Sequence, residues 1–170
     1  MSGYPAPDAA KLTFYRPDFY GNHMKKFTQE AMRGHSTWSV GDRELMAAYV
    51  SKLNECPFCV GAHTPTAARA YQDTERVAAV LADLDCSPIQ EGLRATLRML
   101  GKLTCAGTLS AGDIRSVLSA GVSRPQIEDA LAVSLAFNAT DRLANAFAFD
   151  VLSQDGFEAG AKYLLKRGYR

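Results

Sequence analysis

Residues 44–63 read ELMAAYVSKLNECPFCVGAH, and this stretch decides the local fold. It predicts one helix over 41–54, a short break, and a second helix over 57–72. If the chain turns back at the break, the two helices run antiparallel. Glu44 then lies alongside the segment that holds His63 and not beside the cysteines.

Helical patterns continue on both sides of this stretch. Leu93, Leu97 and Leu100 form an apolar stripe with a spacing close to 3.6 residues. Alanine is frequent, β-branched residues are sparse, and no alternating run is long enough to predict a strand. The expected fold is a single-domain, all-α helical bundle. Its predicted helices are 22–33, 41–54, 57–72, 74–82, 88–103, 111–119, 124–152 and 156–167.

Three serine motifs predict helix starts, because each places a capping hydroxyl three residues before an acid or amide side chain. The capping serines are Ser87, Ser110 and Ser123. Residues 1–21 differ from the rest, since they are rich in Pro, Tyr and Gly and show no helical period. We expect an N-terminal arm over 1–21, lying on the body or on a neighbouring subunit, and a helical domain over 22–170.

Composition excludes several classes of protein. A chain of 170 residues with 47% hydrophobic and 22% charged residues is long and apolar enough for one folded domain. Its net charge of +1 argues against a partner such as nucleic acid or an acidic membrane, which binds concentrated basic surfaces. No segment has the roughly 18 apolar residues of a membrane span.

The N-terminus predicts a cytoplasmic protein, because no charged start is followed by an apolar stretch as in a signal peptide. In a reducing compartment, the four cysteines are not expected to form a structural disulfide framework. We expect Cys86 and Cys105 to be small buried hydrophobic residues. His23 and His35 are expected on the surface.

Cys56 and Cys59 lie at the predicted start of a helix. Two cysteines three residues apart can form a disulfide there, and the free N–H groups and dipole of a helix start stabilise a thiolate. His63 lies one turn beyond Cys59 on the same face, whereas Cys56 is about 10 Å away along the axis. Spacing therefore favours Cys59 as the histidine-activated thiolate, with a lowered pKa, and Cys56 as the resolving thiol.

A proton relay from Glu44 through His63 to Cys59 is compatible with antiparallel helices. A zinc site is the competing interpretation of Cys56, Cys59 and His63, but the sequence offers no convincing fourth ligand. Four polar residues on one face of a later helix have two interpretations: a solvated or subunit-contact stripe, or a buried polar network behind the active site. They are Asn138, Asp141, Arg142 and Asn145.

The pattern Glu-x11-Cys-x2-Cys-x3-His, formed by Glu44, Cys56, Cys59 and His63, resembles the signature of the alkyl hydroperoxidase D fold. This fold lies within the carboxymuconolactone decarboxylase-like superfamily, and the chain is most similar to its peroxidase-related branch. The resemblance is strong over residues 40–75, and the segment Phe137–Phe147 fits more loosely.

The resemblance implies an all-α fold that assembles into trimers or hexamers. It implies a thiol-dependent peroxidase, of peroxiredoxin-type activity, in which Cys59 attacks a hydroperoxide and Cys56 resolves the sulfenic acid as a disulfide. His63 and Glu44 would carry the protons, without a metal or organic cofactor. In the best-known members a dihydrolipoyl adaptor reduces the disulfide. Those members have Ser-His between the cysteines, where this chain has Pro57-Phe58.

Two other functions compete with the peroxidase. A redox-sensing or binding module would share every local feature but would oxidise once and stop. A decarboxylase-like enzyme of the same superfamily would keep its activity without the cysteines, although decarboxylase members generally lack the CxxC motif.

Overall fold

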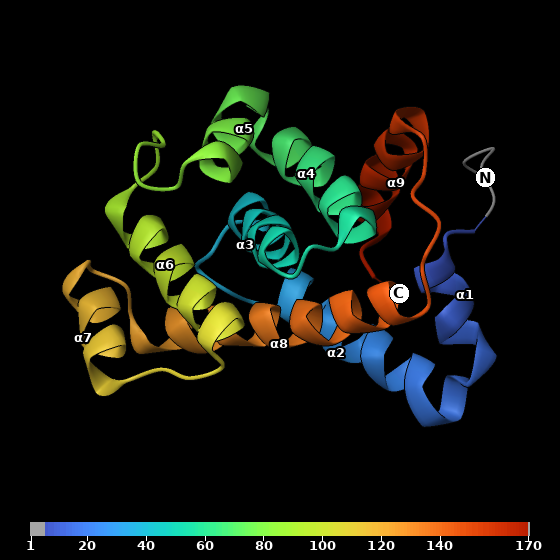
Figure 1. The fold of residues 1–170 in the computed structure, drawn as a ribbon, viewed down its shortest axis with the longest axis horizontal. Helices are drawn as coiled ribbons and strands as arrows, with labels where there is room; N and C mark the ends of the chain where they lie inside the picture. Colours follow the sequence, from blue (N-terminus) through green and yellow to red (C-terminus); the bar gives the residue numbers. More distant parts are fainter. Residues whose placement is uncertain (1–5, 170) are drawn as a thin grey trace.

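Helices account for all the regular secondary structure in the computed structural model, which describes residues 6–169 (Figure 1). The all-α prediction is confirmed, and these residues form no strand. The elements are α1 (Asp8–Tyr15), the π-helix η1 (Pro17–Gly21), α2 (Asn22–Arg33), α3 (Val40–Leu53), α4 (Pro57–Tyr71), α5 (Thr74–Ala82), α6 (Glu91–Ala106), α7 (Ala111–Ser119), α8 (Arg124–Ala146) and α9 (Gln154–Arg167).

Helix α3 is the centre of the molecule, and α2, α4, α5, α6 and α8 pack around it (Figure 1). Nine of its fourteen residues are buried. A helix without a polar face cannot lie at the surface, so the other helices enclose it. Its start is fixed by a capping box between Ser39 and Asp42.

The chain turns back sharply between α3 and α4, as the sequence predicts. Asn54 ends α3, Glu55 takes a left-handed conformation with φ of 52°, and Cys56 is the N-cap of α4. Helix α4 then packs along α3, which brings Glu44 and His63 side by side.

Most predicted helix bounds agree with the structure to within two residues, but α6 begins three residues after its predicted start. Ser110 and Ser123 form the predicted capping boxes. Ser87 does not, because its hydroxyl donates to the carbonyl of Leu84 inside the preceding loop. Gln90 is the N-cap of α6 instead.

Helix α8 ends at Ala146, six residues before the predicted end. Its last turn is closed by Ala148, which has a φ of 49°, and by a hydrogen bond from the backbone N–H of Phe149 to Ala144. A left-handed residue commonly stops a helix, and glycine usually supplies it. An alanine in this role gives no signal in the sequence.

The segment predicted to be a non-helical arm contains α1 and η1, so that expectation is wrong for residues 8–21. Its first five residues lie outside the described part of the chain. Gly21 allows the two helices to meet, because a Cβ there would lie 1.7 Å from the carbonyl oxygen of Thr13. The division into an arm over 1–21 and a domain over 22–170 stays a prediction.

Two apolar clusters stabilise the fold. The larger surrounds α3 and includes Trp38, Leu45, Leu97 and Val133. The smaller, here called the thiol cluster, covers the start of α4. It comprises Cys56, Phe58, Cys59, Ala144 and Phe157, with Ala9, Ala62, Phe149 and Leu152 packed against them. Among residues 6–169, no helix combines the length and the apolar character needed to cross a membrane.

Gly61 lets α9 approach α4, because a Cβ at this position would lie 2.4 Å from the ring of Phe157. We expect Gly61→Ala to lower the free energy of unfolding by about 1 kcal/mol, since overpacking outweighs the helix propensity of alanine. Gly160→Ala is the control, because no atom lies within 4 Å of a Cβ there. It should raise stability by about 0.5–1 kcal/mol. Urea denaturation of both variants tests this, and equal effects would contradict the close approach.

Candidate active site

A buried carboxylate and a histidine meet where α3 and α4 lie side by side. Glu44 is fully buried in α3, and His63 is 4% exposed in α4. Nδ1 of His63 lies 2.7 Å from Oε2 of Glu44. The antiparallel packing thus joins two predicted site residues that are 19 positions apart.

Two residues that the sequence analysis missed complete the surroundings of Glu44. Its Oε1 accepts hydrogen bonds from Nη2 of Arg33 at 2.5 Å and from the hydroxyl of Tyr169 at 2.9 Å. Tyr169 is 125 positions from Glu44, and its ring also lies 5.1 Å from the guanidinium of Arg33. No local sequence pattern connects residues so far apart.

The charges around Glu44 keep it ionised. Burial alone would raise the pKa of Glu44, but the hydrogen bond and charge of His63, together with Arg33, outweigh burial and lower this pKa. The hydrogen bond to the carboxylate fixes the orientation of the His63 ring through Nδ1. Phe137 fixes the ring from one side, with the centroids 4.3 Å apart at 74°.

The two predicted redox cysteines lie together at the start of α4. Each is 1% exposed, both are free thiols, and Pro57 begins the helix between them. Hydrogen bonds from the thiol and the backbone N–H of Cys59 lower the pKa of Cys56 against the effect of burial. Cys56, as the N-cap, therefore carries the more stable thiolate.

The prediction that Cys59 has a lowered pKa is wrong for the reduced pair. Its hydrogen bond to Cys56, its burial and the carboxylate of Asp141 all raise the pKa of Cys59. In the described residues, no hydrogen bond joins Cys59 to His63. The structure thus assembles Glu44 with His63, and Cys56 with Cys59, as two adjoining pairs.

The polar stripe of α8 is divided between the two interpretations, because Asp141 and Asn138 belong to a hydrogen-bond network behind the cysteines whereas Asn145 is exposed. Asp141 is fully buried, and its two oxygens accept hydrogen bonds from Ser51 and from Asn54, each at 2.8 Å. Asn138 bonds to Asn54 as well. Arg142, on the same stripe, is exposed.

One group of side chains in the described residues is close enough to bind an ion together. Sγ of Cys56, Sγ of Cys59 and a carboxylate oxygen of Asp141 lie within 4.8 Å of one another. This group contains Asp141 in place of the His63 that spacing suggested.

The other cysteines and histidines lie apart from this site. Cys86 and Cys105 are exposed, so the prediction that they are buried is wrong. Cys86 lies in the turn between α5 and α6, and Cys105 lies in the last turn of α6. His23 and His35 are exposed, as expected.

An apolar cover separates the cysteines from solvent. Phe58 is 6% exposed and packs edge-on against Phe149, with centroids 5.4 Å apart, and against Phe157 at 6.2 Å. The Phe58 position, where the resemblance would place histidine, thus carries part of this cover. A molecule that reaches the sulfur atoms has to pass apolar side chains.

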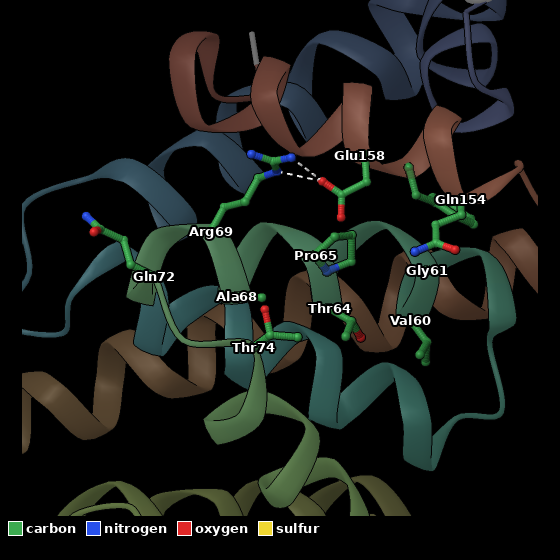
Figure 2. A pocket seen from close by; sticks show the side chains of 11 residues that line it. Val60, Gly61, Thr64, Pro65, Ala68, Arg69, Gln72, Thr74, Gln154 and Glu158 are labelled. Carbon is green, nitrogen blue, oxygen red and sulfur yellow. Dashed lines mark hydrogen bonds and ion pairs between the residues drawn. The ribbon is translucent and has the colours of Figure 1, made fainter.

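A cleft of about 870 Å³ lies on the opposite face of α4, between this helix and the start of α9 (Figure 2). Figure 2 shows Arg69 and Glu158 bridging its rim, where Arg69 Nε donates to Glu158 at 2.7 Å. None of the four predicted site residues lines this cleft. Helical spacing explains this, because Val60, Thr64 and Ala68 share one face of α4 and the inward face holds Cys59 and His63.

Residues 20–87 match the model of the Carboxymuconolactone decarboxylase family, and this range contains all four predicted site residues. No curated protein matches the chain in sequence.

Several solved structures share the fold. An uncharacterized peroxidase-related protein from Silicibacter sp. TM1040 is 22% identical with a TM-score of 0.74, over 93% of this chain and 91% of that one. A second, from Ralstonia eutropha JMP134 and described as an alkylhydroperoxidase AhpD core, is 20% identical with a TM-score of 0.79, over 92% and 82%. The debrominase Bmp8, in its apo form, is 14% identical with a TM-score of 0.75, over 91% and 82%.

Residues 20–87 are therefore similar to the Carboxymuconolactone decarboxylase family, and the chain shares its helical fold with these solved structures.

Glu44→Gln should lower the free energy of unfolding at pH 7 by about 3–5 kcal/mol, because it leaves Arg33 without its buried partner. The stabilisation from Glu44 is present above the ordinary carboxyl pKa, since its folded pKa is lowered. It is lost as the pH falls below about 4.3 towards the folded pKa. The difference between parent and variant should therefore shrink in acid.

Urea denaturation over a pH series measures this difference. Glu158→Gln is the matched control, because its ion pair with Arg69 is partly exposed and contributes no more than about 1 kcal/mol. If Glu44→Gln lowers the free energy of unfolding by as little as the control does, the Glu44 carboxylate is not ionised in the folded protein.

Proposed function

We propose that this protein is an oxidoreductase: a thiol-dependent hydroperoxidase or disulfide reductase that uses Cys56 and Cys59 as its redox centre. The observation that carries the proposal is the position of this dithiol at a helix start, one turn from the paired Glu44 and His63. We place it in the reducing cytoplasm, where such a dithiol is regenerated.

The dithiol has the arrangement that disulfide formation requires. Both thiols lie at the first turn of α4, and the hydrogen bond from Cys59 to Cys56 keeps the two sulfur atoms close. One of them is stabilised as a thiolate, which is the reactive form. Neither thiol is in a disulfide.

The proposed cycle moves two electrons from the dithiol to a hydroperoxide. The proton of Cys59 passes to Cys56, and the Cys59 thiolate attacks the peroxide. The O–O bond breaks, Cys59 becomes a sulfenic acid, and the alcohol leaves with a proton. Cys56 then attacks that sulfur, the S–S bond forms, and water leaves. A dithiol reductant, such as a dihydrolipoyl group, exchanges with the disulfide and restores both thiols.

His63 is the proposed proton carrier of this cycle. Its Nδ1 is held by Glu44, so Nε2 is the nitrogen proposed to exchange protons, and the residue lies one turn after Cys59 on the same helix. No hydrogen bond joins them in the described residues, so we infer that the substrate oxygen lies between them. Glu44, Arg33 and Tyr169 are positioning residues, because they act through His63.

The apolar cover favours an organic hydroperoxide as the substrate. Phe58, Phe149 and Phe157 surround the approach to the cysteines. Burying an alkyl group against these rings is favourable by about 25 cal/mol per Å². Assembly into a trimer or hexamer and a dihydrolipoyl adaptor are proposals that rest on the superfamily resemblance.

Two other functions remain as outcomes of the first assay. A redox sensor would consume about one equivalent of peroxide per dithiol and then stop. A decarboxylase-like enzyme would keep its activity after loss of both cysteines. Sustained, thiol-dependent turnover separates the proposed function from both.

We expect Cys59→Ser to abolish turnover of an organic hydroperoxide with dithiothreitol or dihydrolipoamide as reductant. Cys56→Ser should permit one oxidation and no disulfide. Trapping of the sulfenic acid followed by mass spectrometry locates the oxidised residue. The matched controls are Cys86→Ser and Cys105→Ser, which remove exposed thiols outside the CxxC pair. A sulfenic acid on Cys56 in the Cys59→Ser variant would reverse the two roles.

His63→Asn should reduce kcat/KM by about 10²–10⁴-fold, the usual contribution of general acid–base catalysis. His35→Asn, an exposed control, should leave the rate unchanged. Steady-state kinetics with a saturating reductant gives both values. A His63→Asn rate close to that of the parent would remove the relay from the proposal.

A further inference from the structure

We propose that Cys56, Cys59 and Asp141 form a site for a thiophilic divalent cation such as Zn²⁺, and that the bound ion inhibits the dithiol. The ion would take two sulfur ligands and one carboxylate oxygen. Its binding does not depend on the proposed function, whereas the inhibition rests on it.

The first observation is the convergence of the three ligand atoms. They come from two helices, α4 and α8, and lie within 4.8 Å of one another. Tetrahedral zinc with Zn–S bonds of about 2.3 Å and Zn–O bonds of about 2.1 Å places its ligand atoms roughly 3.5–3.8 Å apart. Small side-chain rotations are therefore sufficient to close the site.

The second observation is a buried carboxylate without a cation. Asp141 is fully buried, yet among residues 6–169 no Lys, Arg or His nitrogen forms an ion pair with it. Glu44, the other fully buried carboxylate, has both Arg33 and His63. Buried charges in proteins are normally paired or coordinate a metal. A divalent cation at the dithiol supplies the missing charge.

The third observation is the orientation of the Asp141 carboxylate. The hydroxyl of Ser51 and the amide of Asn54 each donate to one of its oxygens. The thiols of Cys56 and Cys59 hydrogen-bond to it as well, and none of these partners is a cationic side chain, so they fix the direction of the carboxylate without supplying a cation. Carboxylate ligands of metals are commonly held by such hydrogen bonds from outside the ligand set.

Three protein ligands leave one position of a tetrahedral ion for water or another small molecule. The ion would therefore be exchangeable and not a permanent structural part. Binding removes the proton of Cys59 to solvent and engages both sulfur atoms. A dithiol held in this way can neither attack a peroxide nor form a disulfide.

Cadmium is the probe for this site, because thiolate binding gives it a sulfur-to-metal charge-transfer band in the ultraviolet. The parent for the titration is the reduced full-length protein carrying Cys86→Ser and Cys105→Ser, which removes the exposed thiols. We expect one ion per chain. Asp141→Asn should weaken cadmium binding by at least about tenfold, and Ser51→Ala should also weaken it.

Asp155→Asn is the matched control, because Asp155 is exposed at the start of α9, and its affinity should equal that of the parent. His63→Asn should also keep the parent affinity. An absent band in the parent, or an unchanged affinity in both Asp141→Asn and Ser51→Ala, would overturn the site. Weaker cadmium binding in His63→Asn together with unchanged binding in Asp141→Asn would identify the imidazole, and not the carboxylate, as the third ligand. That result would overturn the site as well.

Inhibition is tested separately. Zn²⁺ should displace cadmium and stop hydroperoxide turnover, and a chelator should restore it. If cadmium binds but the metal-free protein shows no turnover, the proposed function fails and the ion site stands. If hydroperoxide turnover continues when the site is saturated with Zn²⁺, the proposal that the ion inhibits the dithiol is wrong.

Discussion

The carboxylate of Glu44 is the constraint on which the rest of the structure depends. It lies fully buried in the second turn of α3, where an ion without partners would be very costly. Arg33, His63 and Tyr169 meet this requirement from α2, α4 and the C-terminal residues that follow α9. Three distant parts of the chain are thus held in register by one side chain.

The same arrangement orients the chemistry of the site. The hydrogen bond between Glu44 and Nδ1 fixes the imidazole ring of His63, which lies one turn along α4 from Cys59. The sharp reversal at residues 54–56 places Cys56 at the N-cap of α4, where its thiolate is stabilised. Stability of the core and reactivity of the dithiol therefore arise from the same pair of helices.

Two carboxylates are fully buried among the described residues, and they differ in their partners. Glu44 is paired with the guanidinium of Arg33 and bonded to His63, whereas Asp141 accepts hydrogen bonds from the neutral side chains of Ser51 and Asn54. The hydrogen bond to Cys56, burial and the carboxylate of Asp141 raise the pKa of Cys59, in contrast to the expectation from helical spacing. The protonation of the dithiol therefore depends on Asp141 as well as on the spacing within the motif.

The sequence by itself determined the helices, because apolar periodicity and capping are local properties of ten to twenty residues. It also determined which residues form the dithiol and which histidine lies one turn away, since spacing along a single helix fixes both. Only the tertiary structure decided where α8 stops, because Ala148 adopts a left-handed conformation that an alanine in the sequence does not predict. It also decided that Arg33 and Tyr169 meet Glu44 and that Asp141 lies behind the cysteines. These contacts join residues from 11 to 125 positions apart, so they depend on how the helices pack and not on any local pattern.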